Sequence, residues 1–589
     1  MKNKEMKKLM NFWMKVMVAL VGVIIAITIL MSCSKQVTKF QAPLFNNLGT
    51  YWVDASTSSK DANRFFVQGL LLTFNFNHGE AARSFREAIR LDSAFAMAYW
   101  GLAYTLGPNY NAPIDQRVKE EIDWAVKIGQ QVGENLRPWE KLLIEAMKGK
   151  YIAGELEPNL ADHANILRAA VEKIPNDANL QTFLAEALML LHPWDLYDTK
   201  GGPAKEWTPE ILRALNTALD LAPQHPLANH LIIHATEASS TPEDGLAPSA
   251  KMGDIAPGAG HLVHMPSHTY INTGDYHLGT EVNLSAVTAD SLYAAQCKAQ
   301  GAFPLYYYHN YHFLAACAAL EGRGALAIEA SLRMVETIDK SLLSVPGFET
   351  TQHFMTIPYN VLVKFEQWEK IVAMKAPDDR YPYLTAMWSY ARGMAFTNLG
   401  QDETAKRELD RLVAIQQTGD LEEIRVFGAN SVQEIADIAV KVLRAEIAQK
   451  QGDFATAEVL LLEAVTIEDG LSYQEPPDWF FSVRHMLGDL YLKQEKYDGA
   501  AAVYQKDLTI FPKNGFALNG LYHSFMKLGM QDKAAEIKVQ FEKSWEFADS
   551  ELRYSRIDEE KRSDLALNVR PDSPGDVIYL AGNFCGIRQ

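Results

Sequence analysis

The chain has 589 residues, of which 48% are hydrophobic, 22% charged and 10% aromatic, proportions that allow ordinary hydrophobic cores and exclude wholesale disorder. Lysine and arginine number 56 against 73 aspartate and glutamate, which gives a formal net charge of −17. A field of that sign repels phosphate backbones, so we expect no nucleic-acid partner. Four scattered cysteines are too few for a disulfide framework or a CxxC-type metal site.

The first forty residues carry the pattern of an export signal. Five lysines among the first fifteen residues precede an uncharged run from Val16 to Met31, and a cationic head before an apolar core is typical of secretory signals. The run ends in Leu30-Met31-Ser32-Cys33, which resembles the bacterial lipobox. This resemblance implies that residues 1–32 are a lipoprotein signal peptide and that Cys33 is lipidated and becomes the mature N-terminus. The alternative is an uncleaved anchor helix, and either would tether the chain to a membrane.

Residues 33–60 follow the signal and carry Ser, Thr, Gln and Asn without helical periodicity, so we expect a short tether. An acidic protein gains no charge attraction from an anionic membrane, and acyl chains on Cys33 would therefore have to hold it there. We expect a lipid-anchored protein of the bacterial cell envelope that faces the periplasm.

Beyond the tether the sequence repeats itself. One unit has a turn at Lys496-Tyr497 and the following spaced residues: Leu487, Gly488, Tyr491, Ala500, Tyr504 and Pro512. This spacing resembles that of the tetratricopeptide repeat (TPR), a helix-turn-helix unit with small residues where its helices cross and large residues between them. The same offsets recur in residues 69–88, 393–412 and 445–464, and further copies occupy residues 311–334 and 518–541.

The repeats predict an all-α fold. Because each repeat buries its apolar face on its neighbours, we expect residues 61–552 to form one α-solenoid of TPR-like helix-turn-helix units that winds into a superhelix. Residues 553–589 drop the pattern. This C-terminal tail is expected to cap the last helix pair or to pair as a short strand, and it suggests no function.

Nine of the 15 histidines fall between His225 and His312. In the TPR family the first helix of each unit lines the concave face, and the repeat register places most of these histidines there, in a groove spanning about residues 226–360. His225, His277, His163 and His485 are expected to make ordinary hydrogen bonds only.

Two histidine pairs have the spacing of metal ligands. His230 and His234, with Glu237 three residues later, lie on one stripe of a helix. His264 and His268 repeat the same spacing in the next unit. Two such pairs on adjacent helices offer three or four nitrogen ligands, which suit zinc, copper or non-haem iron. We predict these four histidines as ligands and Glu237 as the candidate catalytic residue. Outer candidates at groove-facing places of the same units are His261, His309, His312 and His353.

Pro266 affects the second pair, because proline prefers the first turn of a helix. If Pro266 begins the helix, His261 and His264 belong to the preceding segment and only His268 is helical. Aromatic residues 306–308 are expected either to pack between helices or to form a groove wall. Loops at 107–111 and 192–195 have a composition that is found both in ordinary turns and in loops that line sites.

Three functions are compatible with these features. The first is a membrane-anchored scaffold that binds a ligand or a protein partner and holds a transition metal in its histidine-rich groove. The second is a metal-dependent enzyme, a hydrolase or an oxidoreductase, with Glu237 as general base or orienting residue. The third is an assembly scaffold whose residues 390–545 bind another envelope protein or a peptide. Without metal, the histidines would hydrogen-bond an organic or peptide ligand.

Overall fold

The computed structural model describes residues 42–133, 135–152, 154–297, 303–418 and 421–559. The chain is divided after Leu44, and all elements named below belong to the second unit, which begins at Phe45. The expected signal peptide, residues 1–32, and the lipidation site Cys33 lie outside the described residues. Within the described ranges, no helix has the length and apolar character needed to cross a membrane.

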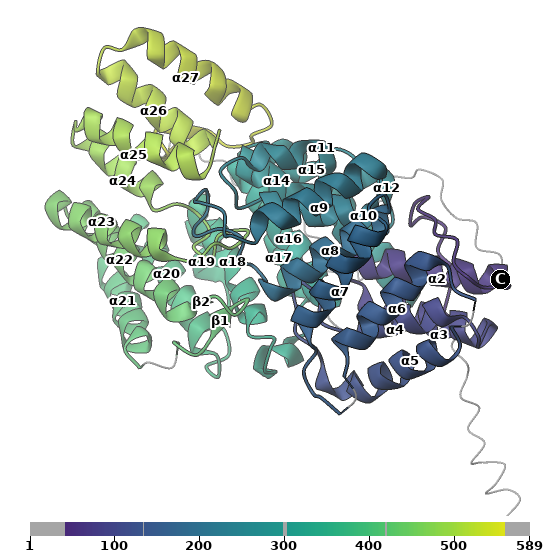
Figure 1. The fold of residues 1–589 in the computed structure, drawn as a ribbon. Coiled ribbons are helices and arrows are strands. Elements are labelled where there is room, and N and C mark those ends of the chain that lie inside the picture. The colour runs from purple at the N-terminus through teal and green to yellow at the C-terminus, as the bar shows by residue number, and fades with distance from the viewer. Residues whose placement is uncertain (1–41, 134, 153, 298–302, 419–420, 560–589) are drawn as a thin grey trace, which may run out of the picture. The chain divides into compact units, whose positions relative to one another are not determined.

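The predicted all-α solenoid is confirmed, since consecutive helices pack in pairs along the second unit (Figure 1). A short 3-10 helix, η1 (Gln116–Val118), directly precedes α5 (Lys119–Gln131). The first pairs are α2 (Lys60–Phe74) with α3 (His78–Leu91), α4 (Ala96–Leu106) with α5 (Lys119–Gln131), α6 (Pro138–Lys150) with α7 (Leu160–Lys173), and α8 (Ala178–Leu191) with α9 (Thr208–Leu221).

The middle of the array is less regular. The helix α10 (Pro226–Thr236) is followed by three short elements, η2 (Pro242–Gly245), α11 (Leu246–Ser249) and α12 (Met252–Ile255). Two short helices, α13 (Gly260–His264) and α14 (Pro266–Thr273), then pack together on the long α15 (Tyr276–Cys297). Regular pairing resumes with α16 (Phe303–Leu320) and α17 (Gly324–Thr337), then η3 (Lys340–Ser344), α18 (Thr350–Lys364) and α19 (Trp368–Ala373).

The last pairs are α20 (Pro382–Asn398) with α21 (Asp402–Gln416), α22 (Val432–Lys450) with α23 (Phe454–Gly470), α24 (Arg484–Lys493) with α25 (Tyr497–Ile510), and α26 (Gly515–Lys527) with α27 (Gln531–Ser544). Two small antiparallel hairpins interrupt or follow them. They pair β1 (Arg425–Val426) with β2 (Asn430–Ser431), and β3 (Leu552–Arg553) with β4 (Arg556–Ile557).

Glycines let neighbouring helices approach closely. Tyr504 of α25 fits between Gly488 of α24 and Gly520 of α26, where a Cβ atom on either glycine would come within 2.3 Å of the ring. Phe85 of α3 fits between glycines of α2 and α4 in the same way. An alanine at such a position would have to displace a buried aromatic ring, which costs about 1–3 kcal/mol. This packing is the physical basis of the repeat seen in the sequence.

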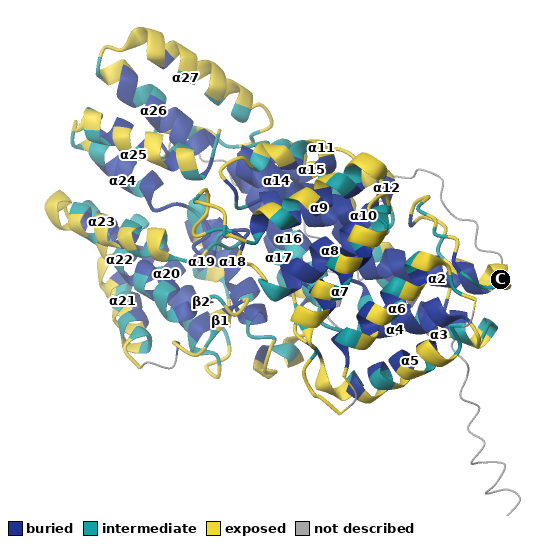
Figure 2. Cartoon of the chain, in the orientation of Figure 1, coloured by how far each residue is buried: buried dark blue, intermediate teal, exposed yellow. Residues whose placement is uncertain are grey.

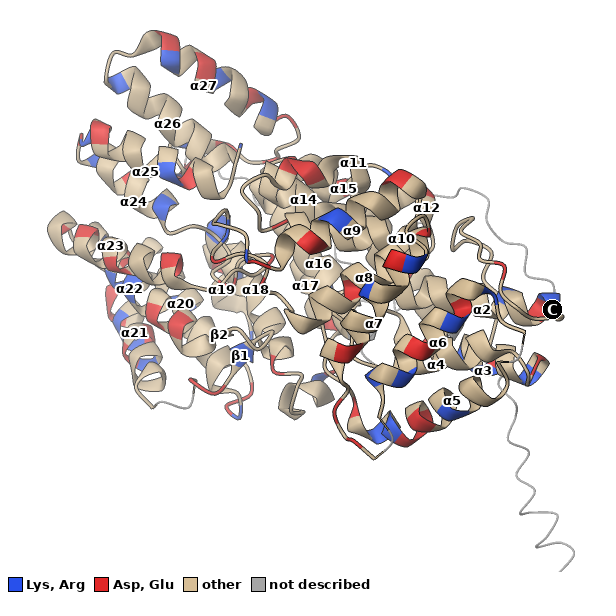
Figure 3. Ribbon diagram, viewed as in Figure 1, with Lys and Arg blue, Asp and Glu red and all other residues tan. Residues whose placement is uncertain are grey.

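Inner and outer helices differ in burial (Figure 2). Residues Ala96 to Thr105 of α4 are all buried, whereas its partner α5 buries one face and exposes the other. Figure 3 shows charged residues of both signs along the outer helices α21 and α27. A helix that is apolar on all sides belongs to a core, so the inner helices are where an enclosed site can form.

Contacts between distant segments join parts of the array that are not neighbours in sequence. The Tyr276 hydroxyl donates to the Pro512 carbonyl oxygen at 2.7 Å, and Gly274, with φ of +74°, lies directly against the same carbonyl. Asn75, after α2, accepts a hydrogen bond from the Leu262 backbone N–H of α13 at 3.0 Å. The helix pairs therefore contact more than their neighbours in sequence.

The second half of the expected tether is packed against the helices. The Phe45 N–H donates to Gln68 Oε1 at 2.8 Å and the Ser56 N–H donates to Glu140 Oε1 at 2.7 Å. The tail likewise begins as part of the array, because Arg556 of β4 pairs with Glu446 at 2.9 Å. Residues that flank the predicted array, 61–552, therefore contact it at both ends.

Candidate metal centre

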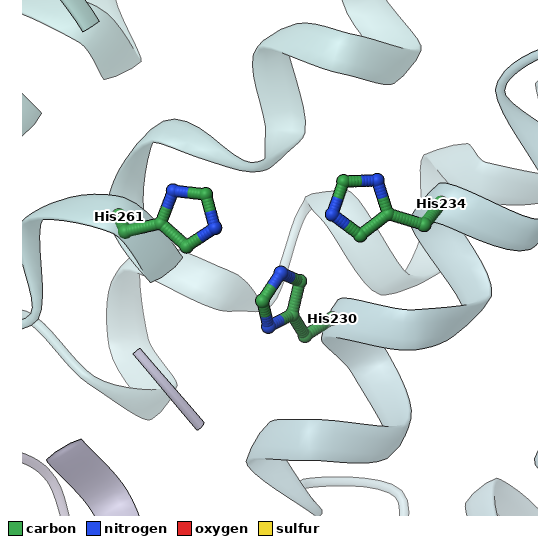
Figure 4. A group of neighbouring side chains, drawn as sticks. All are labelled: His230, His234 and His261. Carbon is green, nitrogen blue, oxygen red and sulfur yellow. The ribbon is translucent and has the colours of Figure 1, made fainter. Parts of the chain in front are cut away.

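The predicted histidines come together, but in a buried cluster and not on an open groove. Of the four predicted ligands, His230 and His264 are 0% exposed, His268 is 2% and His234 is 3% exposed. Figure 4 shows His230, His234 and His261 with their rings facing one another. The four histidines do not line an open groove, because other segments of the chain cover them.

Local sequence explains how α10 presents its two histidines. Pro226 takes the first helical position, and the His225 side chain accepts a hydrogen bond from the Ala228 N–H as the N-cap. His230 and His234 then lie one turn apart on a helix whose residues are all buried. Glu237 is the C-cap residue, one turn after His234.

Pro266 begins α14, so His264 belongs to α13 and His268 to α14. The break between the two helices does not separate the pair, since His264 Nε2 and His268 Nε2 lie 3.0 Å apart. His309 of α16 adds a third ring, with its centroid 4.9 Å from that of His264. His261 of α13 lies on the other side, with its ring centroid 5.0 Å from that of His230.

Two of the histidines have their tautomer fixed by acceptors that cannot donate. His230 Nδ1 lies 2.8 Å from the Phe74 carbonyl oxygen, and His264 Nδ1 lies 2.7 Å from Asn283 Oδ1. Each Nδ1 must therefore carry the proton, which leaves the lone pair on Nε2. The Nε2 of His230 has no partner among the described residues, and that of His264 contacts His268.

In His234 and His268, the Nδ1 atom contacts a carboxylate. His234 Nδ1 lies 3.2 Å from Glu237 Oε1. His268 Nδ1 lies 2.9 Å from Glu237 Oε2 and 2.5 Å from Glu475 Oε2. A carboxylate or carbonyl on the far nitrogen is the usual support of a metal-binding imidazole, because it orients the ring and raises its basicity.

Several buried nitrogens in the cluster lack a hydrogen-bond partner among the described residues. They are Nε2 of His230, Nε2 of His234, both ring nitrogens of His261 and Nδ1 of His309. Buried polar atoms are nearly always hydrogen-bonded, so a group of orphaned lone pairs in one place needs an explanation.

Three groups of side chains place their ligand atoms within 4.8 Å of one another. They are His230 with His234 and His261, His264 with His268 and His309, and His234 with Glu237 and His268. The four predicted ligands are therefore divided between two histidine triads, and the outer candidates His261 and His309 each complete one of them.

Burial governs the charge of these groups. It lowers the pKa of His230, His261 and His309 well below the usual histidine range, so these imidazoles are neutral. His268 is also buried, but the carboxylates of Glu237 and Glu475 raise its pKa to about 10. The cluster thus combines neutral imidazoles and two carboxylates with a protonated His268, which must release its Nε2 proton to bind a transition-metal cation.

A cavity of about 1120 Å³ reaches the cluster at His234 and Glu237. Two segments outside the repeat pattern form much of its wall, residues 194–201 and residues between 468 and 479. Trp194 at its rim has a φ of +60°, a strained value for a large residue, and stacks on Tyr110 with ring centroids 4.9 Å apart. The loops at 107–111 and 192–195 do line this site.

Two outer candidates lie apart from the triads. The His312 and His353 ring centroids are 5.9 Å apart, and His353 Nδ1 lies 2.9 Å from the Tyr383 hydroxyl. Neither belongs to a three-ligand group among the described residues. Tyr306 contacts the His261 ring at a centroid distance of 4.6 Å, so this aromatic residue packs against the cluster.

The histidines that we expected to be ordinary do make hydrogen bonds. His163 Nδ1 bonds the Ala146 carbonyl, His277 Nδ1 pairs with Glu321, and His485 Nε2 lies 3.0 Å from Asp507 Oδ2. His225 acts as the N-cap of α10 and also bonds Asn179.

Sequence reasoning missed Glu475 and the segment after α2. Glu475 lies in the connection between α23 and α24, where no repeat register applies. Phe76 packs on the His230 ring at a centroid distance of 4.6 Å, and the Phe74 carbonyl fixes the tautomer of that ring. A backbone carbonyl has no sequence signature, and a single glutamate in a loop has no spacing to detect.

Comparison with known families identifies one unit. The family model of the tetratricopeptide repeat matches residues 481–514. This segment is similar to a tetratricopeptide repeat. The TPR helices are α24 and α25, in agreement with the unit predicted from Gly488, Ala500 and Tyr504. No curated protein matches the chain.

Solved structures of low identity also match. Human IFIT1, solved as a dimer with m7Gppp-AAAA, is 12% identical over 84% of this chain and 91% of its own, with a TM-score of 0.29. Yeast Tom70 is 13% identical over 83% of this chain and 92% of its own, with a TM-score of 0.28.

Proposed function

We propose that this chain is a metalloprotein whose buried histidine cluster binds zinc, copper or non-haem iron and presents the metal to a ligand in the adjoining cavity. The observation that carries the proposal is the arrangement of His230, His234, His264 and His268. Each ring has its Nδ1 held by an acceptor, so each directs its Nε2 into the same buried region. His268 presents its lone pair there when a metal displaces the Nε2 proton.

A purely structural role explains this arrangement poorly. A polar atom buried without a partner costs about 1–3 kcal/mol, and His230 Nε2 and His234 Nε2 are both in that position. A bound cation would satisfy these lone pairs, and neutral imidazole is the form that binds metal.

The cavity favours a metal-dependent enzyme over a closed structural site. Structural zinc sites have four protein ligands, whereas catalytic sites keep an open position for water or substrate. Here His234 and Glu237 face both the cluster and the cavity. We therefore propose a hydrolase or an oxidoreductase, in which three histidines hold an ion, and Glu237 orients its ligands.

A protein or peptide partner is a second candidate. The outer helix α23 exposes apolar side chains, with Val459 at 55% and Leu462 at 44% exposure. These residues lie in the 390–545 region, which contains the tetratricopeptide repeat. We propose an envelope protein or a peptide as the partner of this face, with the chain held at a membrane through lipidated Cys33 in the periplasm-facing envelope.

The metal is tested on the full-length chain purified in detergent. After equilibrium dialysis against Zn²⁺ or Cu²⁺, bound metal is measured by mass spectrometry. The double variant His234→Ala/His268→Ala removes one ligand from each triad and is expected to lose stoichiometric binding. His523→Ala is the matched control, since His523 is only partly buried, on α26, and belongs to no ligand group.

Equal metal content in the wild type and the double variant would show that the cluster is not a metal centre. A wild type that holds no metal after dialysis would show the same. The histidines would then be hydrogen-bonding groups for an organic or peptide ligand in the cavity.

A further inference from the structure

We infer that the cluster holds two metal ions, one bound by His230, His234 and His261 and the other by His264, His268 and His309. This inference rests on the proposed metal function and concerns the number of ions and the residues that bind each. The two triads share no residue, and the ligand atoms of each lie within 4.8 Å of one another.

Coordination number argues against a single ion. Zinc in proteins usually takes four ligands, at about 2.0–2.1 Å from nitrogen, which places the nitrogens of one tetrahedral ion about 3.4 Å apart. Six imidazoles are more than one such ion accepts. A single ion in the second triad would leave the first triad buried without a partner for its lone pairs.

The first triad has the clearest need for a cation. His230 Nε2, His234 Nε2 and both nitrogens of His261 are buried and have no hydrogen-bond partner in the described part of the chain. The His261 ring centroid is 5.0 Å from that of His230, which in turn is 5.0 Å from that of His234 (Figure 4). A cation at the centre of the three rings would satisfy one nitrogen of each.

The second triad is distinguished by a short contact between two of its ring nitrogens. His264 Nε2 and His268 Nε2 face each other at 3.0 Å, although each ring already has an acceptor at its Nδ1. His309 brings a third ring, at centroid distances of 4.9 Å from His264 and 5.6 Å from His268. A cation coordinated by all three would replace the contact between two facing Nε2 atoms.

Glu237 joins the two triads without being a ligand of a third ion. One carboxylate oxygen lies 3.2 Å from His234 Nδ1, in the first triad, and the other lies 2.9 Å from His268 Nδ1, in the second. Because both contacts are to the nitrogens that point away from the ions, Glu237 is a positioning residue for one ligand of each site. The group of His234, Glu237 and His268 is thus a hydrogen-bonded bridge.

Single variants separate the two sites. His261→Ala removes a ligand from the first triad only, and His309→Ala from the second only. Full-length protein is dialysed against Zn²⁺, and bound zinc is counted per chain. We expect two ions in the wild type and one in each single variant. The His261→Ala/His309→Ala double variant is expected to hold none.

Circular dichroism checks that each variant is folded. If an alanine variant loses its helical signal, His261→Gln or His309→Gln replaces it. One ion per wild-type chain would overturn the two-ion inference and leave the metal function intact. Zero ions would overturn both. Two ions that persist in His309→Ala or His261→Ala would show that the triads are not the binding units.

Discussion

Glu475 Oε2 lies 2.5 Å from His268 Nδ1, although the two residues are 207 positions apart in sequence. Asn272, one turn after His268, also donates to Glu475 and to the Tyr473 hydroxyl. The connection between α23 and α24 therefore closes over α14 and supplies a carboxylate to the histidine cluster. The candidate site depends on this contact between distant parts of the solenoid.

Glu475→Gln should weaken metal binding without removing a ligand. The amide keeps the size of the side chain but loses the charge that orients and polarises His268, and loss of such a supporting group typically costs about 10–100-fold in metal affinity. Competition against a chromogenic chelator measures the change. Asp469→Asn is the control, because Asp469 lines the same cavity but pairs with Arg484. Unchanged affinity in Glu475→Gln would show that the carboxylate does not support the site.

The helices and their pairing could be predicted from local patterns. Gly488 and Tyr504 predict the close crossing of α24 and α25, because the tyrosine ring fills the space that the glycine leaves without a side chain. His230 and His234 could be placed on one face of a helix from their four-residue spacing alone. These features depend on neighbours in sequence, which a repeat register captures.

The burial of the histidines, and their division into two triads, could not be predicted from the repeat pattern. The Phe74 carbonyl is a backbone group at the end of α2, and Glu475 lies in the connection between α23 and α24. Neither carries a periodic signal, yet they hold Nδ1 of His230 and of His268. His261 and His309 appeared as outer candidates because the register gives a face of a helix, but not the distances between rings on different helices.

Lipidation of Cys33 is a separate prediction from the sequence Leu30-Met31-Ser32-Cys33. Cys33→Ala should remove the thiol that would carry the acyl chain, so metabolic labelling with a radioactive fatty acid should lose its band. The variant should accumulate as an unprocessed membrane precursor or be released. Labelling that persists in Cys33→Ala would contradict the lipoprotein assignment.

Asp549 should stabilise the start of α17 from outside that helix. Its carboxylate accepts hydrogen bonds from the Gly324 N–H at 2.7 Å and the Ala325 N–H at 2.9 Å, in the manner of an N-cap. Asp549→Ala should cost about 1 kcal/mol and speed amide hydrogen exchange at Gly324 and Ala325. The exposed Glu546 gives the control variant Glu546→Ala. Equal exchange in both variants would exclude the cap.

The ion pair between Arg556 and Glu446 should make the free energy of unfolding depend on pH in the acidic range. The Arg556 guanidinium lies 2.9 Å from Glu446 Oε2 and 3.0 Å from Glu366 Oε1. Although burial alone would raise the pKa of Glu446, Arg556 lowers it to about 2. The folded pKa is below the unfolded value of about 4.3, so the stabilisation is complete above that value and is lost as the pH falls towards 2.

Arg556→Met should therefore have two effects. At pH 7 it leaves Glu446 buried without its partner and should lower the free energy of unfolding by about 3–5 kcal/mol. Between pH 5 and pH 3 it should also flatten the loss of stability that the wild type shows, because Glu446 no longer has a depressed pKa. Urea unfolding at several pH values measures both effects. Arg553→Met, an exposed arginine in the same hairpin, should change neither quantity. A parallel pH dependence in Arg556→Met and the wild type would show that this ion pair does not control acid stability.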